Sequence, residues 1–322
     1  MKASRAIILA VSSCAALALF LSGAFAQGEK WWEAEKKEET PLVYKEPITR
    51  DGKEAGSMHF NWAADEMVVE GIGLASPSPE LTPAQKEWRA IRAARTVAHL
   101  NLLMATDRIF LTSETVVDMG ELKSQIIKEA VEGYVDRVVE VGKPQVEHLQ
   151  DGSVVAHVWV KRNIYSSTGA GQKSIFYPIN RFESEQRAKE PIVDRRMPDK
   201  VPPASKTKPY TGLIVDCRGK KARPSITPRI VDEQKREIYG SLKVERNYLL
   251  SHGLAGYAAD PESALKLQKD RIGENPLMVE AVDVSGPQKD VAVVDGLAAD
   301  KIMVANKLTK FLNECKVVFV LD

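Results

Sequence analysis

The chain is poor in cysteine, with three among 322 residues. That number excludes a small scaffold held together by many disulfides, and no CxxC pair marks a zinc site. Only Cys217 and Cys315 remain if a leader is removed, and each adjoins an apolar run typical of a strand. The two could form a disulfide if those strands are neighbours in one sheet. Otherwise they are two separate buried thiols.

An excess of charge of either sign is also absent, because 45 Lys and Arg oppose 44 Asp and Glu, for a net charge of +1. The balance gives no reason to expect nucleic acid as a partner. The histidines are few and lack HxH or HExxH spacing, so no metal site is predicted. They are His59, His99, His148, His157 and His252.

Familiar catalytic motifs are missing as well. The segment Ser167–Ser174 (STGAGQKS) comes close to a phosphate-binding loop, but Gln172 separates Gly171 from Lys173. That loop needs Gly-Lys-Ser/Thr in succession before a helix. No GxSxG elbow is present either. The sequence therefore predicts a protein that is not an enzyme and uses no cofactor.

What is present begins with a leader. Lys2 and Arg5 precede the uncharged run Ala6–Leu21, and small residues at Ala24 and Ala26 mark a cleavage site. These are the three parts of a secretory signal peptide, and the run is short of the roughly 20 apolar residues that span a membrane. We predict cleavage after Ala26 and export to the periplasm. Two alternatives are acylation of Cys14 as a lipoprotein and an uncleaved anchor.

Composition divides the remainder into a polar lead-in (27–59), a first domain (60–165), a linker rich in proline and charge (166–208) and a second domain (209–322). The predicted class is α+β, with two small domains, each a mostly antiparallel or mixed sheet packed with helices.

In the first domain, Thr82, Pro83 and Gln85 open a helix with a capping box, and its apolar face recurs as far as Ala105. The other predicted elements are strands at 66–74, 109–117, 134–141, 153–165 and 174–182, and a helix at 121–132.

In the second domain, Asp260 and Pro261 begin a helix that Gly273 ends. The apolar segment 316–321 is predicted to be a central strand. The other predicted elements are strands at 211–216, 277–284 and 291–294, a hairpin of 230–232 with 237–239, and a helix at 297–312.

Two groups of residues are candidate interaction surfaces. Trp31 and Trp32 lie in the lead-in and could contact a partner or a membrane, or belong to a strand added to the first domain. A basic cluster follows the first strand of the second domain and could meet phosphates or an acidic surface; the alternative is a solvated loop. The cluster comprises Arg218, Lys220, Lys221, Arg223 and Arg229.

Several segments resemble known families. GIGLAS (71–76), RAIRAARTVAHLNLL (89–103) and VEGYVDRVVEV (131–141) resemble Lpp20-type outer-membrane lipoproteins and the N-terminal domain of the flagellar assembly protein of the H ring. The second domain, with YTGLIVDCRGKKARPSITPRIVDEQKREIYGS (210–241) and FLNECKVVFVLD (311–322), resembles the C-terminal module that accompanies it in envelope proteins. The resemblance implies a structural role at the outer membrane and supplies no catalytic residue.

Together these features predict a non-enzymatic scaffold or assembly protein, periplasmic or associated with the outer membrane, at the periphery of the flagellar basal body. Its partners would be envelope or basal-body proteins, bound through surfaces and exposed strand edges. The alternatives are a lipid-anchored protein of envelope maintenance, and a binder or hydrolase of cell-wall ligands with its site between the domains.

Overall fold

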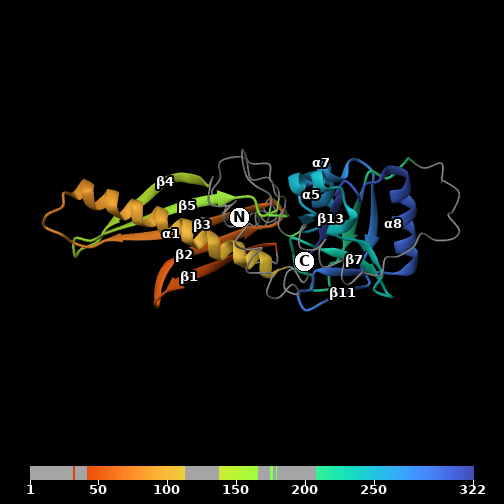
Figure 1. The fold of residues 1–322 in the computed structure, drawn as a ribbon, viewed down its shortest axis with the longest axis horizontal. Coiled ribbons are helices and arrows are strands. Elements are labelled where there is room, and N and C mark those ends of the chain that lie inside the picture. Colours follow the sequence, from red (N-terminus) through yellow and green to blue (C-terminus); the bar gives the residue numbers. More distant parts are fainter. Residues whose placement is uncertain (1–31, 33–41, 113–137, 166–174, 177–178, 180–207) are drawn as a thin grey trace, which may run out of the picture.

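An elongated first domain and a more compact second domain lie end to end (Figure 1). The computed structural model describes residues 32, 42–112, 138–165, 175–176, 179 and 208–322. The predicted α+β class is confirmed, because both domains pack helices against antiparallel, parallel or mixed sheets. Among the described helices, none is long and apolar enough to cross a membrane.

The first domain is built on one five-stranded antiparallel sheet, in the order β1-β2-β3-β5-β4. Its strands are β1 (Val43–Arg50), β2 (Lys53–Asn61), β3 (Glu66–Ala75), β4 (Val139–His148) and β5 (Val154–Arg162). The predicted boundary at residue 60 is therefore wrong. The sheet takes its first two strands from the segment predicted to be a lead-in. Strand β1 was missed because this charged edge strand has no apolar run that would identify it.

One long helix, α1 (Pro83–Leu111), covers one face of this sheet. The predicted capping box is present, with Thr82 accepting a hydrogen bond from the amide of Gln85. The helix lies very close to β3, since a Cβ atom at Gly71 would stand 2.2 Å from the backbone nitrogen of Ala98. Only glycine at that position permits this approach.

The helix continues past Ala105 to Leu111, so the strand predicted from residue 109 is wrong at its start. Ile109 and Phe110 are buried in the last turn of α1 instead. The remainder of that prediction and the helix at 121–132 lie outside the described residues. Strand β4 (Val139–His148) extends beyond the predicted end at residue 141, and residues 134–137 of that prediction lie outside the described residues.

Part of the predicted linker belongs to the core. Ile175, Phe176 and Ile179 are all buried among core residues, and Phe176 and Ile179 are helical where a strand was predicted. Apolar side chains among prolines and charges thus contribute to packing, which composition alone did not reveal. The rest of the linker lies outside the described residues.

The second domain contains two four-stranded sheets. The first is wholly parallel, in the order β10 (Pro276–Glu280), β6 (Gly212–Asp216), β13 (Val317–Val320) and β9 (Gly256–Ala258), with β13 central as predicted. The second has the order β11 (Asp283–Ser285), β12 (Val291–Val294), β7 (Arg229–Asp232) and β8 (Glu237–Tyr239), and β7 and β8 form the predicted hairpin. The strand predicted at 277–284 is divided between the two sheets.

Short helices complete the second domain: η2 (Ser241–Lys243), α5 (Arg246–His252), α6 (Pro261–Leu267), α7 (Lys269–Ile272) and α8 (Gly296–Thr309). Asp260 caps α6 by accepting a hydrogen bond from the amide of Ser263, as the sequence predicts for a helix start there. Helices α6 and α7 bury Ala264 and Ile272 against Ile214 and Val318 of the parallel sheet. Helix α8 lies at the end of the molecule remote from the first domain (Figure 1).

Candidate functional site

A polar cluster lies on the face of the first sheet opposite α1. The Ser57 hydroxyl donates to Glu70 Oε2 at 2.6 Å and lies 2.9 Å from His59 Nε2. The other carboxylate oxygen of Glu70 lies 2.8 Å from His157 Nδ1. Neighbouring strands β2, β3 and β5 thus bring together four side chains from three separate segments of the sequence.

Burial and hydrogen bonding set the charges in this cluster. Burial, with the nearby Lys45, lowers the pKa of His59 to about 4, so this ring is neutral at pH 7. Burial alone would raise the pKa of Glu70, but hydrogen bonds from His157 and Ser57 outweigh it and leave that pKa below its usual value. The bond to Glu70 raises the pKa of His157. The result is an ionised carboxylate held by a hydroxyl and an imidazole.

The geometry is unlike that of a serine nucleophile. In a Ser–His nucleophile pair the imidazole accepts the serine proton, whereas here that proton is directed at Glu70 and the neutral His59 ring can only donate to the hydroxyl oxygen. Ser57 is also 1% exposed, which leaves a substrate no access. We interpret the cluster as a polar network that fixes the register of three strands.

Trp32 contributes to the same face. It packs against Val68 and Trp159, and the ring of Trp159 stacks on His157 with centroids 6.0 Å apart. Trp32 therefore packs on the first domain, and its contact with a partner or membrane stays a prediction. Trp31 lies outside the described residues.

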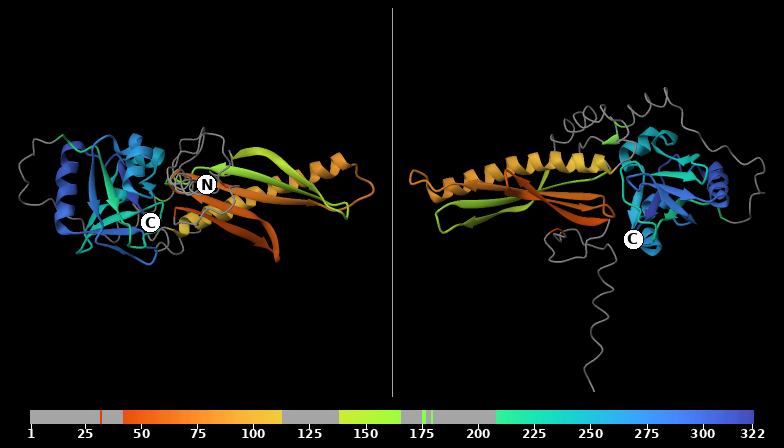
Figure 2. Two further views of the ribbon diagram at one scale, coloured as in Figure 1. Left: turned by 180° about the vertical axis from the view of Figure 1, so that it is seen from behind. Right: turned by 90° about the horizontal axis from the view of Figure 1, so that it is seen from below.

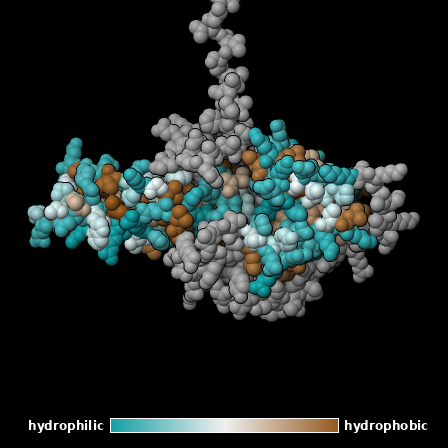
Figure 3. Space-filling model, turned by 90° about the horizontal axis from the view of Figure 1, so that it is seen from above, coloured by the Kyte–Doolittle hydropathy of each residue, from teal (hydrophilic) through white to brown (hydrophobic). Residues whose placement is uncertain are grey.

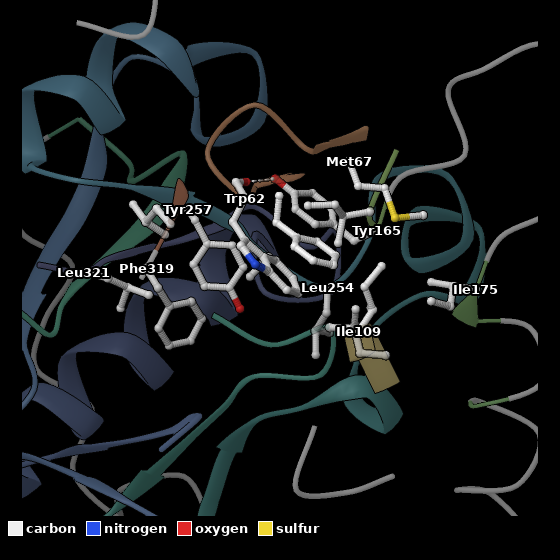
Figure 4. Packing of buried hydrophobic residues seen from close by; sticks show 14 of the residues in the cluster. Trp62, Met67, Ile109, Tyr165, Ile175, Leu254, Tyr257, Phe319 and Leu321 are labelled. Carbon is white, nitrogen blue, oxygen red and sulfur yellow. Dashed lines mark hydrogen bonds between the residues drawn. The ribbon is translucent and has the colours of Figure 1, made fainter. Parts of the chain in front are cut away.

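A second cluster, which we call the aromatic seam, joins the two domains. It consists of Trp62, Tyr165, Tyr257 and Phe319, all less than 5% exposed. Tyr257 lies edge-on to Trp62 with centroids 5.7 Å apart, and the hydroxyl of Tyr165 donates to the carbonyl of Trp62 at 3.2 Å. Figure 4 shows these rings packed between strands of both domains.

Polar contacts flank the aromatic seam. The Gln268 side chain donates to the carbonyl of Ala63 at 3.2 Å, and the Arg271 guanidinium lies 5.9 Å from the centre of the Tyr165 ring. Gly253 has a φ of +73°, and a Cβ atom there would stand 2.8 Å from the Tyr165 ring. Residues of the second domain therefore pack closely against residues of the first.

The seam residues Tyr257 and Phe319 belong to β9 and β13, which lie in the parallel sheet of the second domain. Residues 212–322, which begin at the first residue of β6, match a protein-family model described as Treponema pallidum Tp0624, second domain. This part of the chain is similar to that domain. No curated protein matches the chain.

Within the Tp0624-like part, the structure separates the predicted basic cluster. Arg218 is ion-paired with Asp216 at 2.6 Å, in the turn that follows β6. Lys220 and Lys221 belong to the same turn, whereas Arg229 lies half-buried in β7, in the other sheet. Arg223 is exposed, and its amide donates to the carbonyl of Lys289. Arg229 therefore lies apart from the turn that holds Arg218, Lys220 and Lys221, and binding of phosphates or an acidic surface by these residues stays a prediction.

The structure also contradicts the predicted disulfide, since Cys217 and Cys315 are both free and buried. Their strands β6 and β13 are neighbours, but they run parallel, with Cys217 after one strand and Cys315 before the other. The four-residue length of β13, at about 3.3 Å per residue, separates the thiols by more than the roughly 7 Å that a disulfide allows. Burial raises the pKa of Cys217 to about 12 and that of Cys315 to about 11, so neither forms a reactive thiolate.

At the junction between the domains, the side chains of the aromatic seam are buried against one another. A cavity of about 10 Å³ near Cys217 and Tyr257 has room for a single water molecule. Within the described part of the chain, no three His, Cys, Asp or Glu side chains converge as metal ligands would.

Sequence reasoning missed both clusters. His59, Glu70 and His157 are each separated by more than ten residues, and only the strand pairing brings them together. The signal that was available is the alternation along β2 and β5, which puts polar side chains on one face. For the seam, the available signal was Tyr165 at the end of the predicted strand 153–165, whereas Trp62 follows strand β2, which was not predicted.

Proposed function

We propose that this protein is a non-enzymatic scaffold of the bacterial cell envelope, exported to the periplasm or bound at the outer membrane. It would hold partner-binding surfaces at a fixed separation within an assembly such as the periphery of the flagellar basal body. The lipid-anchored alternative depends on Cys14, which lies outside the described residues.

The aromatic seam is the observation that carries this proposal. Domains joined by few contacts move freely, whereas a large apolar interface makes them one body. Trp62, Tyr165 and Tyr257 are buried together, and Gln268 adds a hydrogen bond across the junction. A rigid elongated molecule is suited to spacing other proteins, and an enzyme would more often keep a cleft open at this position.

The edges of the first sheet are poorly suited to bind partners, contrary to our prediction from the sequence. Edge strand β1 contains Pro47 and a register irregularity at Ile48. Edge strand β4 contains Pro144 and an irregularity between Val141 and Gln145. Prolines and bulges disfavour the addition of a further strand.

The outward face of α1 is better suited to bind a partner. Trp88, Leu100 and Met104 are 59%, 43% and 41% exposed, and the Arg92 guanidinium lies 5.3 Å from the centre of the Trp88 ring. A surface hollow of about 400 Å³ lies along this face, and Leu103 contributes to its lining. Elsewhere, Figure 3 shows apolar residues in small groups among polar ones, which is usual for a soluble surface.

The proposal is tested by crosslinking the tagged chain in native envelopes, purifying it and identifying the attached proteins by mass spectrometry. We expect ring or rod proteins of the basal body. Recovery of cell-wall enzymes only, or of nothing, would overturn the proposal.

A double substitution tests whether the outward face of α1 is the surface that binds partners. Leu100→Glu with Met104→Glu should abolish the recovery of partners, because charge on an exposed helix face disrupts an apolar contact without unfolding the chain. Leu265→Glu on α6 is the matched control, since Leu265 is 42% exposed on the other domain. Equal recovery with both variants would show that α1 is not the surface.

A further inference from the structure

Helix α8 carries apolar residues on the side that faces away from the second domain. Its inner face buries Ala299, Ile302 and Ala305. On the outer side, Leu297 is 76% and Leu308 is 65% exposed, the highest exposures of any large apolar side chain in the described part of the chain. These two leucines lie at the ends of one helix face, with the half-buried Val304 between them, and this exposed apolar row is a candidate contact surface.

The spacing on this outer face is that of a coiled-coil seam. Leu297, Lys301, Val304 and Leu308 follow one another at intervals of four, three and four residues. Such intervals place all four side chains along one line on a helix and match positions d, a, d and a of a heptad. A single lysine within an otherwise apolar line is a device that fixes register and orientation.

The row formed by Leu297, Lys301, Val304 and Leu308 can pair with the same row of a second copy when the two helices run antiparallel. A two-fold axis midway along α8 would place Leu297 of one copy against Leu308 of the second, and Lys301 against Val304. The same axis brings Asp300 beside Lys307 of the second copy, twice by symmetry. A parallel pair would set Lys301 against Lys301, and like charges so placed are unfavourable.

We propose that two copies of this chain associate through the outer faces of α8, antiparallel and about a two-fold axis. The contact is isologous, with the same patch used on both copies. Because α8 lies at the end of the molecule remote from the first domain, both first domains stay accessible in the pair (Figure 1). This inference is independent of the proposed function and of the α1 surface.

A single helix pair buries less than the roughly 800 Å² per partner of a standard interface, so the association is weak and depends on concentration. Sedimentation velocity of the full chain from about 5 to 500 µM should show a monomer converting to a dimer in that range. Leu308→Glu should weaken the dimer by roughly 100-fold, because the change acts twice in a symmetric contact. Leu265→Glu on α6 should leave it unchanged. A monomer at every concentration overturns the proposal.

Charge reversal tests the orientation. Asp300→Lys and Lys307→Asp should each weaken the dimer by roughly threefold to tenfold, and the double variant should restore it. These positions are at the surface of the helix, so folding is retained. Failure of the double variant to recover would overturn the antiparallel arrangement.

Crosslinking gives an independent readout. In a Cys14→Ser background, Leu297→Cys with Leu308→Cys should form a covalent dimer on mild oxidation, whereas either single variant should not. Cys217 and Cys315 are buried and will not interfere. Efficient crosslinking of Leu297→Cys alone would show that the helices run parallel and would overturn the proposal.

Discussion

The two faces of the first sheet are held by different forces. Toward α1, Gly71 and Gly73 meet Ala94 and Ala98 backbone to backbone, and the contact is dry and steric. The right view of Figure 2 shows the helix on one side of the sheet only. On the opposite side, Ser57, His59, Glu70 and His157 form a hydrogen-bonded network. The stability of the α1 face depends on close packing that glycine permits. The stability of the opposite face depends on hydrogen bonds and charge.

This difference predicts that added side-chain volume lowers the stability of the protein most on the α1 face. Gly71→Ala should destabilise the protein by about 3 kcal/mol or more, because the added methyl group meets backbone that has no room to move. Thermal or urea unfolding measures this loss. Leu74→Ala on the same strand is the control, since Leu74 is 58% exposed and should change the stability by less than about 0.5 kcal/mol. Similar losses in both variants would refute the close approach.

On the face with the hydrogen-bonded network, we expect the stability of the protein to depend on pH. The folded pKa of His59, about 4, lies below its usual 6.5, so the unfolded chain binds more protons between these values. Stability should therefore fall as the pH is lowered from 6.5 toward 4, by about 3 kcal/mol from this residue. His59→Gln should flatten that loss in unfolding experiments across the same range. An unchanged slope would contradict the burial of a neutral ring.

The raised pKa of His157 acts in the opposite direction. Its contribution is complete below pH 6.5 and is lost as the pH rises through the higher folded value. Stability of His59→Gln should therefore decline mainly on the alkaline side of 6.5.

The smallest effect comes from removing one charge of the network. Glu70→Gln keeps the shape but weakens the bonds to Ser57 and His157, and should cost about 1–2 kcal/mol. Glu66→Gln on the same strand weakens the ion pair with Lys161, a partner 45% exposed, and should cost less than about 1 kcal/mol. Equal costs in urea unfolding would mean that the network contributes no more than a surface ion pair.

Much of the fold could be predicted because its signals are local. The capping residues Thr82 and Asp260 marked helix starts, and the hairpin of β7 and β8 was visible from its turn. Strand β1 was missed because this charged edge strand lacks the apolar alternation that identifies a strand. Strand β2 was missed although it is an inner strand, because its alternation is confined to the few residues Ser57–Asn61. The candidate clusters were missed for a different reason, since their members meet only through strand register.

The sequence by itself determined the α+β class, most helix starts and the central place of β13, because these depend on residues close in the chain. The tertiary structure alone decided that Cys217 and Cys315 stay apart, since strand direction is not encoded locally. The tertiary structure also decided that Tyr165 and Tyr257 belong to one core shared by the two domains. These residues are about ninety positions apart in the chain, so only the folded structure brings them into contact.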